Sequence, residues 1–239
     1  MDVEIREPDV SPLQLQGPNS GKIMQALFGE SIGELGYYWL DGFDLDGIPL
    51  IVSRTGWSSE LGYEIYLRDG TRGDELWERI MAAGKPFGLA PGHTSSIRRI
   101  EAGMLSYHGD MDINTNPFEI GLGRLVDLDM EADYIGKAAL NRIARDGVSR
   151  LQVGLEIDGE PFAGANNEFW PISVSGQRVG QVTSAIYSPR LEANIALAMV
   201  HIEHSAIDTR VEVGTPGESR SARIVPKPFY DPGKNLVKS

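Results

Sequence analysis

The stretch RTGWSSELGYEIYL, residues 54–67, sets carboxylates among aromatic side chains and glycines. In an alternating strand, Tyr63 and Ile65 share one face, while Glu64 and Tyr66 share the other. A carboxylate beside an aromatic ring suits a flat heterocycle with adjacent N–H donors, because two parallel charge-assisted hydrogen bonds fix its orientation. Glu64 is therefore a candidate ligand-binding residue, with a solvated strand carboxylate as the simpler alternative.

Two consecutive arginines, Arg98 and Arg99, raise a second question of the same kind. They lie in a segment with helical spacing, where neighbouring residues point to different sides of the helix. At most one of them therefore faces a given pocket, and surface salt bridges are an equally good explanation for each. Among the tryptophans, Trp57 is of interest because it lies close to Glu64, whereas the others are expected to serve packing.

Several kinds of catalytic site do not fit the sequence. The segments GRLVDL and GKAAL lack the spacing of a phosphate-binding loop, and no GxGxxG follows a predicted strand. The segment GHTSS does not match the GxSxG pattern of a serine hydrolase. The four histidines are scattered, with no HExxH pair, so no metal site is predicted.

Composition narrows the choice of partners further. Lys+Arg 22 against Asp+Glu 34 gives a formal net charge of −12, which disfavours nucleic acid and anionic membranes but allows a locally basic pocket. The absence of cysteine rules out disulfides and thiolate chemistry. The first residues lack the pattern of a secretory signal and no apolar run could span a bilayer, so a cytoplasmic protein is expected.

Periodicity predicts an α+β region followed by an all-β region. Strands are expected at 9–16, 41–45, 48–54 and 62–67, and helices at 19–28, 73–84, 97–107 and 134–147. From Ser149 onward, short strand candidates alternate with turns, and no further helix is predicted. This pattern is typical of a small barrel or sandwich. We therefore expect a boundary near Gly147, with domains at 1–147 and 148–239.

Seven motifs in order connect the chain with a known family. They are QGPNS (16–20), RTGWSSELGYEIYL (54–67), IRRIEAGMLSYHGDMD (97–112), NPFEIGLGRLVDLD (116–129), DYIGKAAL (133–140), TSAIYSPRLEANIALAMV (183–200) and VPKPFYDP (225–232). Together they resemble the aminomethyltransferase family, that is, the glycine-cleavage T-protein and its relatives. The resemblance implies the C-terminal part of a folate-binding α+β region, then a Greek-key β-barrel, with tetrahydrofolate as one-carbon acceptor.

The resemblance also implies site residues. In the T-protein, the glutamate of the GYEI-like motif binds the pterin end of folate, and that glutamate corresponds to Glu64. Its neighbours Tyr63 and Trp57 are expected to contribute to the same cofactor site. So are Ser95, which stands where T-proteins carry an arginine, and Arg98. No catalytic residue is assigned.

Departures from the T-protein pattern indicate one branch of the family. The IRxIE pattern, YYW at 37–39 and GWS at 56–58 look more like the dimethylsulfoniopropionate demethylases. That branch passes a methyl group from a sulfonium to tetrahydrofolate. The expected substrate is then a small methyl donor, with Trp57 or Tyr37 offering an aromatic face to the cationic sulfur.

Alternatives within and outside this branch stay open. They are a glycine-cleavage-type aminomethyltransferase, an O-demethylase of methoxylated aromatics, and a non-catalytic folate-binding module. Full-length relatives also carry a further segment before the QGP motif. The chain is expected to be a fragment, one half of a split protein whose partner chain supplies that segment, or a reduced gene. Activity is expected to depend on the missing segment.

Overall fold

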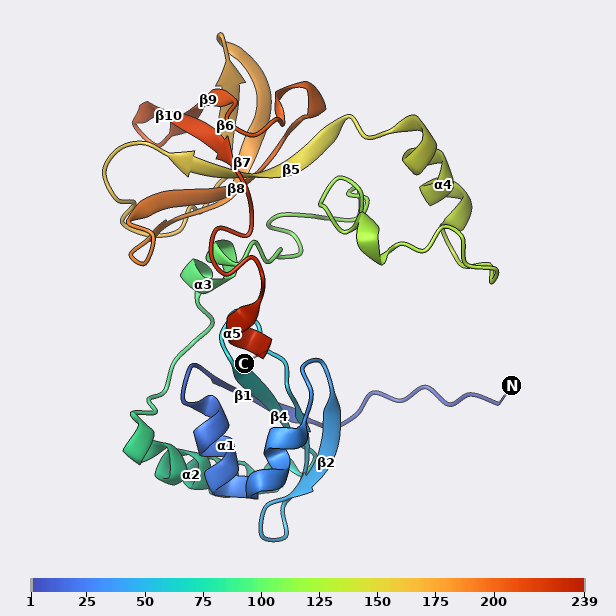
Figure 1. Cartoon of the computed structure of the whole chain (residues 1–239), viewed down its shortest axis with the longest axis vertical. Coiled ribbons are helices and arrows are strands. Elements are labelled where there is room, and N and C mark those ends of the chain that lie inside the picture. Colours follow the sequence, from blue (N-terminus) through green and yellow to red (C-terminus); the bar gives the residue numbers. More distant parts are fainter. Residues whose placement is uncertain (1, 239) are drawn as a thin grey trace. The chain divides into compact units, whose positions relative to one another are not determined.

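A computed structural model describes residues 2–238 of the chain. The chain divides into two compact units, residues 1–95 with 233–239, and residues 96–232 (Figure 1). The first unit contains a four-stranded sheet with helices, and the second contains a barrel. The predicted order, an α+β region followed by an all-β barrel, is confirmed.

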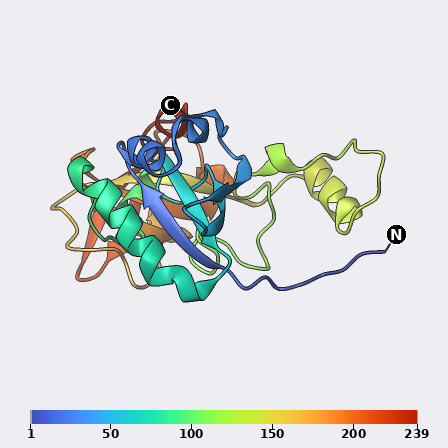
Figure 2. The same cartoon turned by 90° about the horizontal axis from the view of Figure 1, so that it is seen from below.

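The sheet of the first unit is antiparallel throughout, in the order β1-β4-β3-β2. Its strands are β1 (Ser11–Gln16), β2 (Leu40–Asp44), β3 (Pro49–Ser53) and β4 (Gly62–Leu67). Two helices belong to this unit, α1 (Ser20–Phe28) and α2 (Gly73–Gly84), and Figure 2 shows α2 alongside β1. A final short helix, α5 (Asn235–Lys238), is also assigned to it.

One face of this sheet forms the core of the first unit. Side chains from α1 and α2 pack there against alternate strand residues, including Tyr63, Ile65 and Leu67 of β4. The intervening residues Glu64 and Tyr66 are half-buried and lie on the opposite face. The alternation in the sequence thus predicts correctly which face of β4 is apolar.

The second unit is a closed antiparallel barrel, in the order β10-β5-β8-β7-β6-β9. Its strands are β5 (Arg150–Ile157), β6 (Trp170–Val174), β7 (Gln177–Ser188), β8 (Ala193–His201), β9 (Arg210–Thr215) and β10 (Glu218–Val225). Alternate residues fill the interior, among them Leu155, Ile172, Val182 and Ala198. Closure pairs strands that are not consecutive: β5 with both β8 and β10, and β6 with β9.

Two further helices lie in the second unit, α3 (Ser96–Glu101) and α4 (Lys137–Asp146). Within residues 2–238, the remaining helical segments are short 3₁₀ helices at Glu30–Glu34, Gly70–Arg72, Lys85–Phe87, Gly123–Leu125 and Ile202–His204.

The helix expected over 97–107 is shorter than predicted. It ends at Glu101, because Gly103 adopts a left-handed φ of 63° and the carbonyl of Glu101 accepts the backbone N–H groups of Phe229 and Tyr230. The expectation of no helix after 149 was also wrong. The helix α5 has only four residues, too few for helical periodicity to be visible in the sequence.

The compact units divide at Ser95–Ser96, well before the boundary expected near Gly147. The helix α3 packs on the barrel, where Ile100 joins an apolar cluster with Ile186, Ile195 and Leu197. Residues 96–149 therefore belong to the barrel unit, although its first strand begins only at Arg150.

Candidate functional site

Glu64 is held by side chains from both sides. It lies opposite Gln14 on β1 and Ser53 on β3. The Gln14 amide donates to one carboxylate oxygen at 3.1 Å, and the Thr55 hydroxyl donates to the other. A carboxylate offers about four acceptor positions, so each oxygen keeps capacity for one more donor. The arrangement suits a ligand that presents two adjacent N–H groups.

The loop between β3 and β4 is fixed by Gln16. Its amide nitrogen donates to the carbonyls of Thr55 and Tyr63, each at 3.3 Å, and its amide oxygen accepts the Ser58 hydroxyl at 2.5 Å. Because Gln16 bonds the backbone of Thr55, it also helps to hold the hydroxyl that binds Glu64.

The Gln16 amide explains two glycines of the motif. A Cβ atom at Gly56 would come within 2.1 Å of the Gln16 amide oxygen, and one at Gly62 within 2.2 Å. Neither distance is sterically possible without displacing the amide. The glycines therefore leave room for the side chain that fixes the loop.

The structure does not bring Tyr63 to the face that carries Glu64. Tyr63 is 4% exposed and lies in the core against the helices. Burial raises the pKa of its hydroxyl, and Arg54 partly opposes that effect. We expect Tyr63 to serve packing.

Trp57 and Ser95 line one cavity of about 450 Å³ within the first unit. It lies among β1, α2 and the segment 89–95, and its remaining walls are mainly apolar, with Leu13, Leu15, Ile80, Met81, Leu89 and Pro91. Trp77 of α2 also lines it and is 40% exposed, although the sequence assigned this tryptophan to packing. Helical spacing alone gave no sign of that exposure.

Tyr37 lies on the segment before β2, away from the lining of this cavity as the structure describes it. Its ring makes an edge contact with Tyr38, with centroids 4.5 Å apart. Burial, then a hydrogen bond with Tyr38, raises the pKa of Tyr37 to about 12. The hydroxyl therefore stays protonated at neutral pH.

The consecutive arginines have different partners, both in the second unit. Arg98 pairs with the carboxylate of Glu101 at 3.2 Å, and Glu101 is 2% exposed. Arg99 is itself buried and pairs with Asp110 at 2.6 Å. The prediction that they point to different sides is confirmed. We expect both ion pairs to stabilise the barrel unit.

Neither a metal site nor a membrane span is visible in the part of the chain that the structure describes. Residues 2–238 contain no group of three or more histidine, cysteine, aspartate or glutamate side chains placed to hold a metal ion. No helix among them has the length and apolar character needed to cross a bilayer.

Fold and motifs together define a T-protein-like chain, an α+β region joined to a β-barrel. Residues 1–130 match the GCVT N-terminal domain family, and residues 150–231 match the glycine cleavage T-protein C-terminal barrel domain. The chain belongs to the glycine cleavage T-protein family.

Individual relatives cover both predicted branches. The chain is 40% identical to dimethylsulfoniopropionate demethylase DmdA of Ruegeria pomeroyi, over 93% of the chain and 60% of that protein. It is 38% identical to an aminomethyltransferase of Symbiobacterium thermophilum, over 94% of the chain and 60% of that protein. The chain therefore spans about 60% of the length of these relatives.

A solved structure supports the fold. The glycine cleavage system aminomethyltransferase T from Bartonella henselae aligns with a TM-score of 0.75 and 23% identity. The alignment covers 93% of this chain and 60% of that one.

Proposed function

We propose that the chain carries the pterin-binding part of a tetrahydrofolate-dependent methyltransferase, which takes a methyl group from a small sulfonium donor such as dimethylsulfoniopropionate. The observation that carries the proposal is the position of Glu64, held by Thr55 and Gln14 with two acceptor positions left for adjacent N–H groups. The 40% identity to a dimethylsulfoniopropionate demethylase supports the choice of donor.

For this reaction the protein mainly has to align the methyl group of the donor with the accepting nitrogen of tetrahydrofolate. A sulfonium is already an activated methyl donor, and tetrahydrofolate supplies the nucleophilic nitrogen when bound. Glu64 orients the pterin edge through two charge-assisted hydrogen bonds. Trp57, which is 37% exposed at the wall of the cavity in the first unit, offers an aromatic face to a cation. No general acid or base is assigned to this chain.

The test is tetrahydrofolate binding to the full chain, by calorimetry under anaerobic conditions. Glu64→Gln should weaken binding more than tenfold, about 1.4 kcal/mol or more, because a charged acceptor becomes a neutral amide. Glu78→Gln makes the same charge change at an exposed position of α2 and should leave binding unchanged.

A second variant separates position from charge. Thr55→Val keeps the carboxylate but removes one of the donors that hold it. We expect a smaller loss of affinity, a few-fold, because Glu64 can still reach the ligand. Equal affinities for the unaltered chain and Glu64→Gln would contradict the proposal, as would no binding at all.

An aminomethyltransferase is the second candidate, since such an enzyme is 38% identical over 94% of the chain. It would act on an aminomethyl group carried by a lipoyl-bearing protein, passing the one-carbon unit to tetrahydrofolate and releasing the nitrogen as ammonia. Product analysis distinguishes the two: 5-methyltetrahydrofolate from a sulfonium donor supports the demethylase type, and turnover with the lipoyl-bound donor alone supports the other. Folate binding without turnover of either donor would indicate a binding module.

A further inference from the structure

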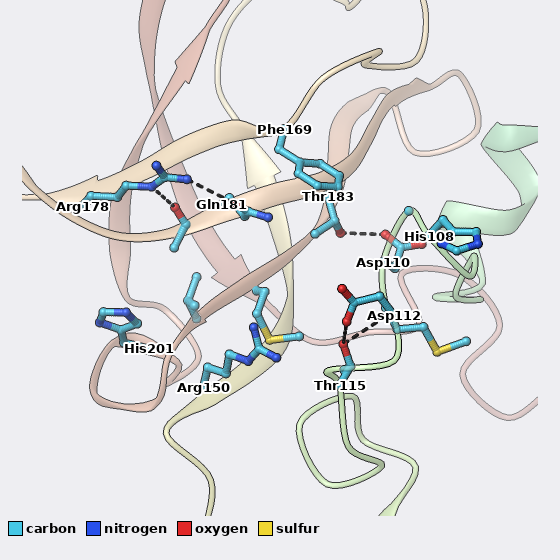
Figure 3. Close-up of a pocket in the computed structure, with 15 residues that line it drawn as sticks. His108, Asp110, Asp112, Thr115, Arg150, Phe169, Arg178, Gln181, Thr183 and His201 are labelled. Atoms are coloured by element: carbon cyan, nitrogen blue, oxygen red, sulfur yellow. Dashed lines mark hydrogen bonds between the residues drawn. The ribbon is translucent and has the colours of Figure 1, made fainter.

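The barrel unit has a cavity of its own, of about 390 Å³. Its walls come from the ends of β5, β7 and β8 and from the segment 108–115 (Figure 3). The volume lies in the range of small-ligand sites. Charged side chains of both signs line it. Those that have no ion-pair partner within the protein indicate which charged groups of a ligand the cavity could bind.

Two of these charges, Arg150 and Asp110, are already paired within the barrel unit. Arg150 binds Glu119 at 2.8 Å and also donates to the Asn114 carbonyl at 3.1 Å. Asp110 pairs with buried Arg99 at 2.6 Å. These paired side chains form part of the cavity wall, and their charges largely neutralise one another. They therefore offer little net charge to a ligand.

One cation in the wall has only neutral partners. Arg178 donates to the Gln181 side-chain oxygen at 3.0 Å and to the Gly180 carbonyl at 3.5 Å. Among residues 2–238 it forms no ion pair within 4 Å, and its remaining terminal nitrogen makes no hydrogen bond. The guanidinium is thus oriented by neutral groups and keeps its full charge.

One anion in the wall, Asp112, is likewise held by neutral hydrogen-bond partners. Asp112 accepts the backbone N–H of Asn114 at 2.9 Å and the Thr115 hydroxyl at 3.0 Å. These hydrogen bonds, the Asn114 backbone first, lower its pKa, so it is ionised at neutral pH. Within the described residues no cation comes within ion-pair distance of it, and Arg150 acts on it only from farther away.

These two charges lie on different sides of the cavity. Figure 3 shows Arg178 on one side and Asp112 on the other, with Phe169 between them in this view. Phe169 is 49% exposed, so its ring is accessible to a ligand. An aromatic face and a carboxylate are the usual partners of an organic cation, and an arginine is the usual partner of a carboxylate.

We propose that this cavity binds a small zwitterion, with the carboxylate of the ligand at Arg178 and its cationic group between Asp112 and Phe169. A ligand with a single charge would pair with either Arg178 or Asp112 and leave the other charge without a partner. A neutral ligand would satisfy neither. The proposal does not depend on methyl transfer or on folate binding, since its residues differ from those around Glu64.

Glycine betaine is the probe, because two close analogues each lack one charge. The compound 3,3-dimethylbutyrate replaces the ammonium nitrogen by carbon, and choline replaces the carboxylate by a hydroxymethyl group. Dissociation constants are measured by NMR titration of the full chain at low salt, since salt screens exposed charges. We expect betaine to bind at least fivefold more tightly than either analogue.

Two variants test which residue binds the carboxylate of betaine and which binds its ammonium group. Arg178→Gln should weaken betaine at least fivefold and leave choline unchanged. Asp112→Asn should weaken betaine similarly, and should remove its advantage over 3,3-dimethylbutyrate. Glu64→Gln should leave betaine binding unchanged, which keeps this test separate from that of the folate site.

The result that would overturn the proposal is equally definite. Betaine binding no tighter than that of 3,3-dimethylbutyrate would show that Asp112 and Phe169 do not recognise a cation. Betaine affinity that is unchanged in both variants would place any binding elsewhere on the chain.

Discussion

The buried carboxylate of Asp110 should be the most sensitive polar position of the barrel unit. It accepts four hydrogen bonds: from Arg99 at 2.6 Å, the Ser106 backbone at 2.9 Å, Thr183 at 2.6 Å and Ser184 at 2.7 Å. Its side chain is 0% exposed and that of Arg99 is 10% exposed. The network ties the segment around Asp110 to β7.

We consider Asp110→Asn, which keeps the shape and removes the charge. The new amide can face Thr183 and Ser184, because each hydroxyl oxygen can accept once its hydrogen turns away. The Thr183 hydrogen can turn to the Leu197 carbonyl at 3.1 Å, and the Ser184 oxygen, which accepts from Arg99 at 2.8 Å, has a second lone pair for the amide. The Arg99 and Ser106 donors then keep an oxygen partner. What cannot be recovered is the charge opposite the buried guanidinium.

The magnitude follows from that loss. Removing one partner of a buried ion pair costs about 3–5 kcal/mol. Because Asn keeps a neutral hydrogen bond to Arg99, we expect the lower end, about 3 kcal/mol. For a unit of this size the melting temperature should fall by roughly 6–12 °C, at about 2–4 °C per kcal/mol.

The assay has to report on the barrel alone, since the two units can unfold separately. We would therefore measure urea unfolding of the barrel unit through the hydrogen exchange of peptides from β7 and β8. Arg99→Gln with Asp110→Asn completes a double-mutant cycle, and we expect a coupling of about 2 kcal/mol or more between the two positions. A cost below about 1 kcal/mol for Asp110→Asn would refute the reasoning that the pair is strong because it is buried.

Three further predictions concern other parts of the chain. Gly62→Ala should destabilise the first unit by about 1–3 kcal/mol, since the new Cβ displaces the Gln16 amide, and the cost should shrink in a Gln16→Ala background when both are measured by urea unfolding. Burial lowers the pKa of Lys227 from 10.5 to about 8, with Asp110 opposing. The unfolded state then binds more protons between pH 8 and 10.5, so barrel stability should rise over that range by up to about 3 kcal/mol, and Lys227→Met should lose the rise. Trypsin should cleave first in α4, at Arg142 or Arg145, because no side chain of that helix is buried; mass spectrometry showing an intact α4 after other sites are cut would contradict this.

Local patterns in the sequence were sufficient for the fold and for the strand face on which the candidate binding residue Glu64 lies. Alternation over β4 placed Tyr63 and Glu64 on opposite faces, and the structure has them there. Short strands with turns from Ser149 onward predicted the barrel. In each case the signal lies within a few consecutive residues, where the period of a strand is visible.

The residues that hold Glu64 could not be found in this way. Gln14 is 50 positions away in sequence, and it meets Glu64 only because β1 pairs with β4 in a particular register. The cavity of the barrel unit was missed for the same reason, since Asp112 and Arg178 come from a loop and a strand far apart in the chain. The boundary at Ser95–Ser96 likewise depends on where α3 packs, which local propensity does not determine.

The partners of each carboxylate separate two roles in this acidic chain. Three carboxylates are buried, and each is paired with an arginine: Glu101, Glu119 and Asp110. Their charge is neutralised within the barrel unit, where removing one partner would leave a buried charge unpaired.

Glu64 and Asp112 differ from these three. Both are more exposed, and the hydrogen bonds that hold them come from amides and hydroxyls alone. Neutral donors fix the position of a carboxylate without cancelling its charge, so a ligand cation or a pair of ligand N–H groups can still meet a full negative charge. This difference gives a physical reason, independent of family resemblance, for placing ligand sites at Glu64 and Asp112. It also predicts that neutralising either residue should affect binding more than folding, the reverse of what we expect for Asp110.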